Sequence, residues 1–312
     1  MTNAALLIVN PSSGRELATD NADRIEASLR TRYEDIEVVT TQGDGDAERA
    51  AATAAASGRG TVFVAGGDGT VNEAVNGVAG AGALGEIRFG IIPLGTGNDF
   101  AAGLGIPAEV DEALAVLAQE RELRVDLGKV NGRVFINTSG GGYIAEVSVA
   151  VTPQLKTIAG RLAYLIGGAQ AMWEYEPVSA TINAEPGGFR LGLKLYAFAV
   201  CNSRLIGGGR LIAPSAIIDD GLLDVCLIEG MTGVEFLALA RKVADGEHVE
   251  DPRVRYLQAS SIVIDLEPEA WINTDGEVLS ARRCEYSVLP GAATFLCGDA
   301  PFTTAQQSHR VV

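Results

Sequence analysis

Short apolar runs alternate with helical stretches through about the first hundred residues, and this alternation restricts the fold more than any other feature. Each run is followed by a stretch of helical composition, and the runs occupy residues 6–10, 36–41, 61–65 and 89–92. A strand–helix rhythm of this kind is typical of a parallel sheet with helices on both faces. We therefore expect an α/β, doubly wound parallel sheet over residues 1–125, with Asp46 capping its second helix and the third helix starting at about Val71.

From about Val125 the sequence changes character. Its segments become short, are rich in β-branched residues and are separated by glycine, asparagine and proline turns. This spacing predicts a β-rich, antiparallel and sandwich-like domain over residues 126–297, interrupted by helices at about 154–173 and 233–244. Residues 298–312 are the segment that could return to the first domain.

The charge and cysteine content exclude several classes of protein. The chain has 312 residues and a formal net charge of −16, which repels nucleic acids and anionic bilayers. Its four cysteines show no C-x-x-C spacing, so we expect buried free thiols in a reducing compartment rather than a zinc site. No apolar run reaches the roughly 18 residues that span a bilayer, and the first residues lack a secretory signal. These features predict a cytoplasmic location.

Loops rich in glycine, serine, threonine and asparagine follow three of the expected strands. In an open parallel sheet such loops meet at the carboxyl edge, where glycines allow close backbone approach and free N–H groups cradle anions. Helix N-termini aimed at the same point favour negative charge. The sequence therefore predicts a polyphosphate site formed by Asn10, Pro11, Ser12, Ser13 and Gly14, by Gly66, Gly67, Asp68, Gly69, Thr70, Val71 and Asn72, and by residues 93–100.

An acidic residue inside a phosphate cradle repels the ligand unless a cation lies between them. Asp68 is such a residue, and we interpret it as a direct or water-mediated ligand of nucleotide-bound Mg²⁺. Asp99 either assists Asp68 or caps its own helix. The chain has no G-x-x-x-x-G-K-S/T sequence, and its first strand–helix turn lacks G-x-G-x-x-G, so Walker-type and Rossmann dinucleotide sites are disfavoured.

The loop at residues 66–73, together with Pro-Leu-Gly-Thr-Gly-Asn-Asp-Phe-Ala at 93–101, resembles the diacylglycerol kinase catalytic domain family. That family includes soluble bacterial diacylglycerol kinases and the sphingosine and ceramide kinases. Gly-Gly-Asp-Gly-Thr alone is shared with NAD kinases and 6-phosphofructokinases, whereas the second stretch is much more specific to lipid kinases. Further matching segments extend the resemblance over nearly the whole chain, at residues 10–14, 126–128, 137–143, 207–214, 219–224 and 273–277.

The resemblance implies how the nucleotide and the lipid would be bound. The loops at 10–14 and 66–72, together with Thr41 and Thr96, would hold ATP. Glu277 would accept the proton of the lipid hydroxyl. That role suits the chemistry, because a lipid alcohol needs a proton acceptor and neither of the two histidines looks placed to serve.

The resemblance also implies further roles near metal ions. Asp126 would lie in the cleft between the domains and support the metal and phosphate chemistry. A structural Mg²⁺ would be bound by Asp220 and by the carbonyl oxygens of Ile217 and Leu222. The family further implies that homodimers occur.

These observations predict a lipid kinase that transfers the γ-phosphoryl group of Mg-ATP to a lipid hydroxyl. Diacylglycerol, giving phosphatidic acid, is the default substrate, while sphingoid bases, ceramide and phosphatidylglycerol remain open. The alternatives are a catalytically silent lipid- or nucleotide-binding protein, which the retained acids Asp68, Asp126 and Glu277 disfavour, and an NAD kinase, which the 93–101 stretch disfavours. The helix at 154–173 either packs on the β-rich domain or lies at a lipid interface during transient membrane association.

Overall fold

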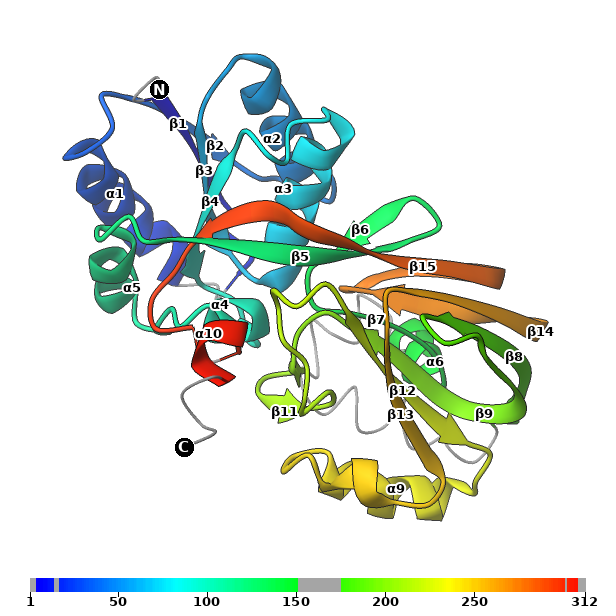
Figure 1. Cartoon of the computed structure of the whole chain (residues 1–312). Coiled ribbons are helices and arrows are strands. Elements are labelled where there is room, and N and C mark those ends of the chain that lie inside the picture. The colour runs from blue at the N-terminus through cyan, green and yellow to red at the C-terminus, as the bar shows by residue number, and fades with distance from the viewer. Residues whose placement is uncertain (1–3, 14–16, 151–174, 301, 308–312) are drawn as a thin grey trace.

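The computed structural model describes residues 4–13, 17–150, 175–300 and 302–307. Its first part contains four parallel strands in the order β2–β1–β3–β4, namely β1 (Ala4–Val9), β2 (Asp35–Thr40), β3 (Thr61–Gly66) and β4 (Arg88–Pro93). The helices of this part are α1 (Leu17–Arg30), α2 (Asp46–Ala56), α3 (Asp68–Gly80), α4 (Asp99–Gly103) and α5 (Val110–Leu117). Figure 1 shows α1 and α5 on one side of these strands and α2 and α3 on the other.

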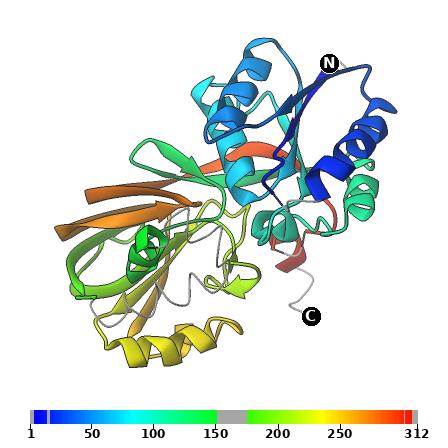
Figure 2. The same ribbon diagram turned by 180° about the vertical axis from the view of Figure 1, so that it is seen from behind.

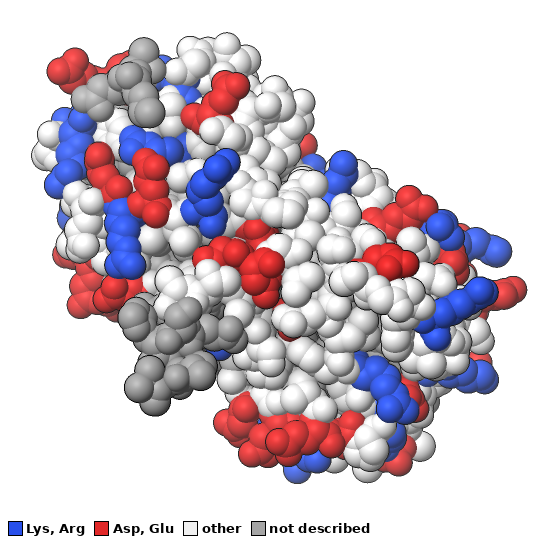
Figure 3. All heavy atoms as spheres, in the orientation of Figure 1, with Lys and Arg blue, Asp and Glu red and all other residues white. Residues whose placement is uncertain are grey.

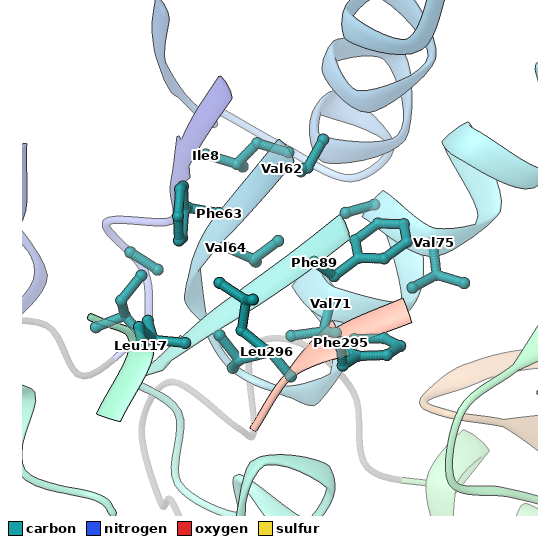
Figure 4. Packing of buried hydrophobic residues seen from close by; sticks show 14 of the residues in the cluster. Ile8, Val62, Phe63, Val64, Val71, Val75, Phe89, Leu117, Phe295 and Leu296 are labelled. Carbon is teal, nitrogen blue, oxygen red and sulfur yellow. The ribbon is translucent and has the colours of Figure 1, made fainter. Parts of the chain in front are cut away.

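The central strands of the first part are buried on both faces and form the centre of its core. All residues of β3 are buried, as are those of β1 after Ala4. Figure 4 shows Phe89 of β4 and Val71 of α3 packed with Phe295, which comes from near the end of the chain, and Phe63 of β3 belongs to the same core. The Phe89 and Phe295 rings stack with their centroids 5.1 Å apart. A near-continuous apolar run in the sequence therefore becomes the buried centre of a parallel sheet.

The second part is built from antiparallel strands, as expected. They are β5 (Glu122–Val130), β6 (Arg133–Phe135), β7 (Thr138–Gly142), β8 (Val178–Glu185), β9 (Phe189–Cys201), β10 (Leu205–Ile206), β11 (Arg210–Leu211), β12 (Leu223–Glu229), β13 (Val254–Ala259), β14 (Ser261–Thr274) and β15 (Glu277–Leu296). Short helical elements accompany them: α6 (Tyr143–Ala150), α9 (Gly233–Lys242), the 3₁₀ turn η1 (Glu247–Glu250) and α10 (Thr304–Gln307). The helix expected at 154–173 lies outside the described residues.

One strand joins the two parts. The end of β15 pairs in parallel with β4 through Thr294 and Phe295, while most of its length pairs antiparallel with β14 and β5. A single sheet of thirteen strands therefore runs through the described chain, and most of its pairings are antiparallel. The expected doubly wound parallel sheet is thus not confirmed as the class of the fold, which is mixed α/β with a parallel part and a β-rich part.

Two expectations about helix starts are wrong. Asp46 does not cap α2; the N-cap is Gly45, with a φ of 78°, and Asp46 Oδ2 accepts hydrogen bonds from the backbone of Gln42 and Gly43. Asp46 is already inside the helix, so its short side chain reaches back to the preceding turn. The third helix begins at Asp68 rather than near Val71, which places Asp68 in its first turn.

Helices α2 and α3 approach each other closely at one glycine. A Cβ on Gly77 would lie 2.1 Å from the carbonyl oxygen of Glu48, whereas a Cβ on Gly80 of the same helix would meet nothing within 4 Å. The backbones of the two helices therefore touch where Gly77 lies. This contact fixes the position of the Glu48 backbone relative to α3.

We expect Gly77→Ala to destabilise the protein by about 1–3 kcal/mol, because the α2 backbone must shift to admit the methyl group. Gly80→Ala is the matched control, and alanine should leave stability unchanged or raise it by up to about 1 kcal/mol. Chemical denaturation of both variants measures the difference. Equal unfolding free energies would contradict the close contact between α2 and α3.

Candidate active site

The loops that follow β3 and β4 meet backbone to backbone. A Cβ on Gly95 would lie 2.6 Å from the Cα of Gly67, closer than real side chains come. Asn98, with a φ of 54°, closes the second loop: its Oδ1 accepts from the Gly95 N–H and its Nδ2 donates to the Gly95 carbonyl, both at 2.9 Å. The structure therefore brings these two glycine-rich loops together at the carboxyl edge of the parallel strands.

The loop after β1 joins the same region. The Asn10 side chain donates from Nδ2 to Thr70 Oγ1 at 2.8 Å, and a Cβ on Gly67 would lie 4.0 Å from Ser13 Oγ. A hollow of about 100 Å³ opens here, lined by Asn10, Ser12, Thr41, Gln42, Gly43, Asp44, Thr70 and Glu73. Four residues expected to hold the nucleotide thus share one hollow, namely Asn10, Ser12, Thr41 and Thr70.

The other described residues expected to hold the nucleotide do not line this hollow. Val71 and Asn72 are buried in α3, and Val71 belongs to the hydrophobic core. Gly66 leaves room for the Thr70 side chain, because a Cβ on Gly66 would lie only 2.9 Å from it. Thr96 is exposed in the loop after β4. Gly14 lies outside the described residues.

Asp68 directs its carboxylate toward α4. Its Oδ2 accepts a hydrogen bond from the Asp99 N–H at 3.1 Å, and its Oδ1 accepts one from the Phe100 N–H at 3.0 Å. Burial raises the pKa of Asp68 and the nearby Asp99 raises it further, while the hydrogen bonds oppose the rise. A Cβ on Gly97 would lie 3.2 Å from Asp68 Oδ2 and 3.3 Å from Asp99 Oδ2, so both carboxylates flank this glycine. Two buried acids at one point suit a divalent cation.

Asp99 does not cap its own helix, because the N-cap of α4 is Asn98. Its buried carboxylate instead accepts hydrogen bonds from the N–H groups of Gly208 at 3.0 Å and Gly209 at 2.7 Å. These glycines, with φ values of 86° and 96°, form the turn between β10 and β11. Asp99 therefore connects the loop after β4 to the β-rich part.

Asp275, in the turn between β14 and β15, anchors the β-rich part against Asp68. Its carboxylate accepts hydrogen bonds from the N–H groups of Ile136 at 2.6 Å, Asn137 at 3.2 Å and Thr138 at 2.9 Å. The Asn137 side chain in turn donates to Asp68 Oδ1 at 3.4 Å. Burial raises the pKa of Asp275 to about 7, although these three N–H groups favour the charged form.

Glu277, the expected proton acceptor, is the first residue of β15. Its side chain is 43% exposed and forms an ion pair with Arg133, whose Nη2 also lies 2.7 Å from Glu48 Oε2. The pKa of Glu73 is raised chiefly by burial and, among smaller causes, by the charge of Glu277. Glu277 does not line the hollow itself, but its charge acts on Glu73, which does.

Asp126 of β5 binds two turns through their backbones. Its Oδ2 accepts from the Gly221 N–H and its Oδ1 from the Gly291 N–H, both at 2.6 Å. Its own N–H donates to the Ile218 carbonyl at 2.8 Å. Burial raises the pKa of Asp126 against these hydrogen bonds. The contacts show that Asp126 holds the turn before β12 and the irregular part of β15 in place.

Asp220 lies among other carboxylates. Burial, followed by the charges of neighbouring aspartates led by Asp224, raises its pKa to about 6. Asp220 Oδ1 accepts a hydrogen bond from the Leu222 N–H at 3.0 Å. Among the described residues, no group of three or more histidine, cysteine, aspartate or glutamate side chains could hold a metal ion. A cation here would therefore need backbone carbonyls such as those expected of Ile217 and Leu222, and the concentrated negative charge fits a hard cation.

Sequence reasoning assigned no role to several residues that shape this site. Asn137, Asp275 and the glycines at 208–209 lie inside segments that resemble the family, and that resemblance is the signal that could have found them. Arg133 lies outside those segments. Its partner Glu277 is 144 residues away, so no local pattern reveals the pair.

Comparison with known proteins identifies the family. The family model for the diacylglycerol kinase catalytic domain matches residues 4–130, and the model for the YegS C-terminal NAD kinase beta sandwich-like domain matches residues 138–297. The chain belongs to the diacylglycerol kinase catalytic domain family. It is 33% identical over 274 residues to the diacylglycerol kinase of Bacillus subtilis, covering 88% of this chain and 89% of that protein.

Other members of the diacylglycerol kinase family are similar over the same length. A Pseudomonas aeruginosa protein named "Probable lipid kinase YegS-like" is 34% identical over 282 residues, with 89% of this chain and 90% of that protein covered. The crystal structure of a diacylglycerol kinase from Bacillus anthracis superposes with a TM-score of 0.75 at 27% identity, covering 96% of this chain and 98% of that one. The expected family and the expected class of enzyme, a lipid kinase, are confirmed. None of the helices among the described residues is long and apolar enough to cross a membrane.

We expect Asp275→Ala to lower the free energy of unfolding by at least about 2 kcal/mol, because it removes the acceptor of three N–H groups at a buried site. Asp23→Ala, at an exposed position of α1, is the control and should change little. Urea denaturation of the two variants and the parent measures the effect. A loss no larger than that of the control would show that Asp275 does not anchor the segment that leads into β7.

Proposed function

We propose that this protein transfers the γ-phosphoryl group of Mg-ATP to a lipid hydroxyl, that of diacylglycerol in the first instance, giving phosphatidic acid. One observation carries the proposal. The turn between β14 and β15 reaches across to the glycine-rich loops, so that Asp275 and Asn137 link to Asp68, while the charge of Glu277 acts on Glu73, which lines the hollow. A phosphate cradle on one part of the chain and a carboxylate from the other are the components that phosphoryl transfer to an alcohol needs.

The nucleotide would be bound by the loops around the hollow. Backbone N–H groups of the glycine-rich turns and the side chains of Asn10, Ser12, Thr41 and Thr70 offer hydrogen bonds to phosphate and sugar oxygens. The N-terminus of α3 adds favourable partial charge for an anion. Asp68 and Asp99 would hold the nucleotide's Mg²⁺, which would neutralise charge on the transferred group.

The lipid hydroxyl would lose its proton to Glu277. Among the charged side chains placed near the hollow, Glu277 comes from the β-rich part, whereas Asp68 and Glu73 are both on α3. The Glu277 carboxylate is partly exposed and can accept a proton late in the transfer. Asp126 would act at a distance, by holding the turns that position Asp220 and β15.

The overall charge favours a neutral lipid alcohol over an anionic one. The formal net charge of −16 repels phosphatidylglycerol more than diacylglycerol. Figure 3 shows acidic and basic side chains interspersed over the described part of one face, without a broad basic field on it. Relatives named diacylglycerol kinase support the same substrate, while the YegS-like relatives are named only for an unspecified lipid.

A panel of acceptors tests the function. Purified protein with γ-labelled ATP and Mg²⁺ should phosphorylate diacylglycerol in mixed micelles faster than ceramide, a sphingoid base or phosphatidylglycerol. Glu277→Gln should lower kcat by at least about 100-fold, because the proton acceptor is lost, with ATP affinity nearly intact. Asp265→Asn, in an exposed ion pair on β14, is the control and should keep full turnover.

The outcomes of this assay distinguish a lipid kinase from an NAD kinase and from a catalytically silent protein. Labelling of NAD in place of a lipid would favour an NAD kinase. Nucleotide binding without labelling of any acceptor would favour a catalytically silent protein. Turnover of Glu277→Gln within a few-fold of the parent would exclude Glu277 as the proton acceptor.

The proposed structural Mg²⁺ site predicts a pH-dependent stability. In the folded protein the pKa of Asp220 is about 6, above its ordinary 3.8, so without metal its stabilising protonated form is lost as pH rises through about 6. With EDTA, Asp220→Asn should therefore lose less thermal stability than the parent between about pH 5 and about pH 7.5. Added Mg²⁺ should raise the Tm of the parent at the higher pH and leave that of Asp220→Asn unchanged. Asp245→Asn, at an exposed position, is the control; an equal Mg²⁺ response in Asp220→Asn would exclude the site.

A further inference from the structure

Arg133 joins three elements at the edge of the site. It is the first residue of β6, and its Nη2 contacts Glu48 Oε2 of α2 at 2.7 Å and Glu277 Oε1 at the start of β15. Burial lowers the pKa of Arg133, but its contacts with Glu48 and Glu277 outweigh burial and raise the pKa above its usual value. Arg133 is therefore a permanent cation placed between two acids.

The backbone that carries Arg133 is fixed independently of these ion pairs. The buried side chain of Asn76 in α3 donates from Nδ2 to the Val134 carbonyl at 2.9 Å and accepts from the Val134 N–H at 3.0 Å. Figure 2 shows the hairpin of β5 and β6 reaching α3. Removing the Arg133 side chain should therefore leave the hairpin in place.

Without Arg133, the acids near Glu277 would repel its carboxylate. Glu73 of α3 is close enough to interact electrostatically with Glu277, and Glu48 shares the same arginine. Without a cation, repulsion among these three carboxylates would drive the most exposed of them, Glu277, toward water. Arg133 offers the opposing attraction, and its rigid guanidinium also restricts the direction of the carboxylate.

We propose that Arg133 is a positioning residue that holds the Glu277 carboxylate at the hollow in the orientation needed to accept a proton. The inference rests on the proposed function of Glu277. The side chains of Arg133, Glu48 and Glu277 are 26%, 36% and 43% exposed, so water screens their ion pairs. Such pairs contribute little to stability, and the role of Arg133 therefore lies in orientation rather than in folding. Displacing a catalytic group by about 1 Å can cost on the order of 100-fold in rate.

The test compares Arg133→Gln and Arg133→Lys with the parent in the diacylglycerol assay. Arg133→Gln should lower kcat by about 10- to 100-fold, with the KM for ATP and the Tm nearly unchanged. Arg133→Lys retains the charge without the guanidinium fork and should recover part of the loss. Arg283→Gln is the matched control, because Arg283 also pairs with two acids, Asp265 and Glu285, on the surface of β15; it should keep full turnover.

A double-mutant cycle identifies the residue through which Arg133 acts. In the Glu277→Gln background, Arg133→Gln should cause no further fall in the residual kcat, since it acts through Glu277. A further 10-fold fall would overturn the inference, because it would indicate direct contact with the transferred phosphoryl group. A kcat of Arg133→Gln within twofold of the parent would also overturn it, while leaving Glu277 as the acceptor. Failure of the proposed function is distinct, because Glu277→Gln itself would then retain turnover.

Discussion

The arrangement of the site depends on one buried carboxylate in a tight turn. Asp275 accepts the N–H groups of Ile136, Asn137 and Thr138, and Asn137 then reaches Asp68 on the nucleotide side. This turn also begins β15, so the interaction that links the β-rich part to the glycine-rich loops is also the one that places Glu277. Burial disfavours the ionised form of Asp275 and raises its pKa to about 7. The hydrogen bonds from the three N–H groups favour the ionised form and so oppose this rise.

Negative charge is concentrated wherever the two parts of the chain meet. Asp68 and Asp99 flank Gly97, and Asp220 lies beside Asp224. Burial raises the pKa of Asp68 and of Asp220, which indicates that each group is more costly to ionise than in water. Such sites are strained electrostatically until a cation arrives, and metal-bound nucleotide would supply one. Under the proposed function, these acids would favour the magnesium complex over the free, highly charged nucleotide.

The sequence predicted the elements whose signal is local and missed the contacts that join distant segments. The apolar runs at 61–65 and 89–92 predicted two strands, and the structure has strands at 61–66 and 88–93 with the expected glycine-rich loops after them. The prediction that Asp46 caps α2 was wrong because the N-cap is the preceding residue, Gly45, which has a positive φ. The partners of Asp99 are more than a hundred residues away, in a turn of glycines that carries no side-chain signal. Nothing in the sequence indicated that one strand, β15, joins both parts, because its pairing with β4 involves only Thr294 and Phe295.

The length of β15 explains how two differently built parts can form one site. Its first residue is Glu277, and near its end Phe295 stacks on Phe89 in the core beneath the nucleotide loops. The strand is irregular between Leu289 and Ala293, where Gly291, with a φ of 54°, donates its N–H to Asp126 at 2.6 Å. Asp126 therefore fixes the bend of the strand that connects the proposed proton acceptor to the core. A buried acid in this position can affect catalysis without touching nucleotide or lipid, because the bend it holds sets where Glu277 lies.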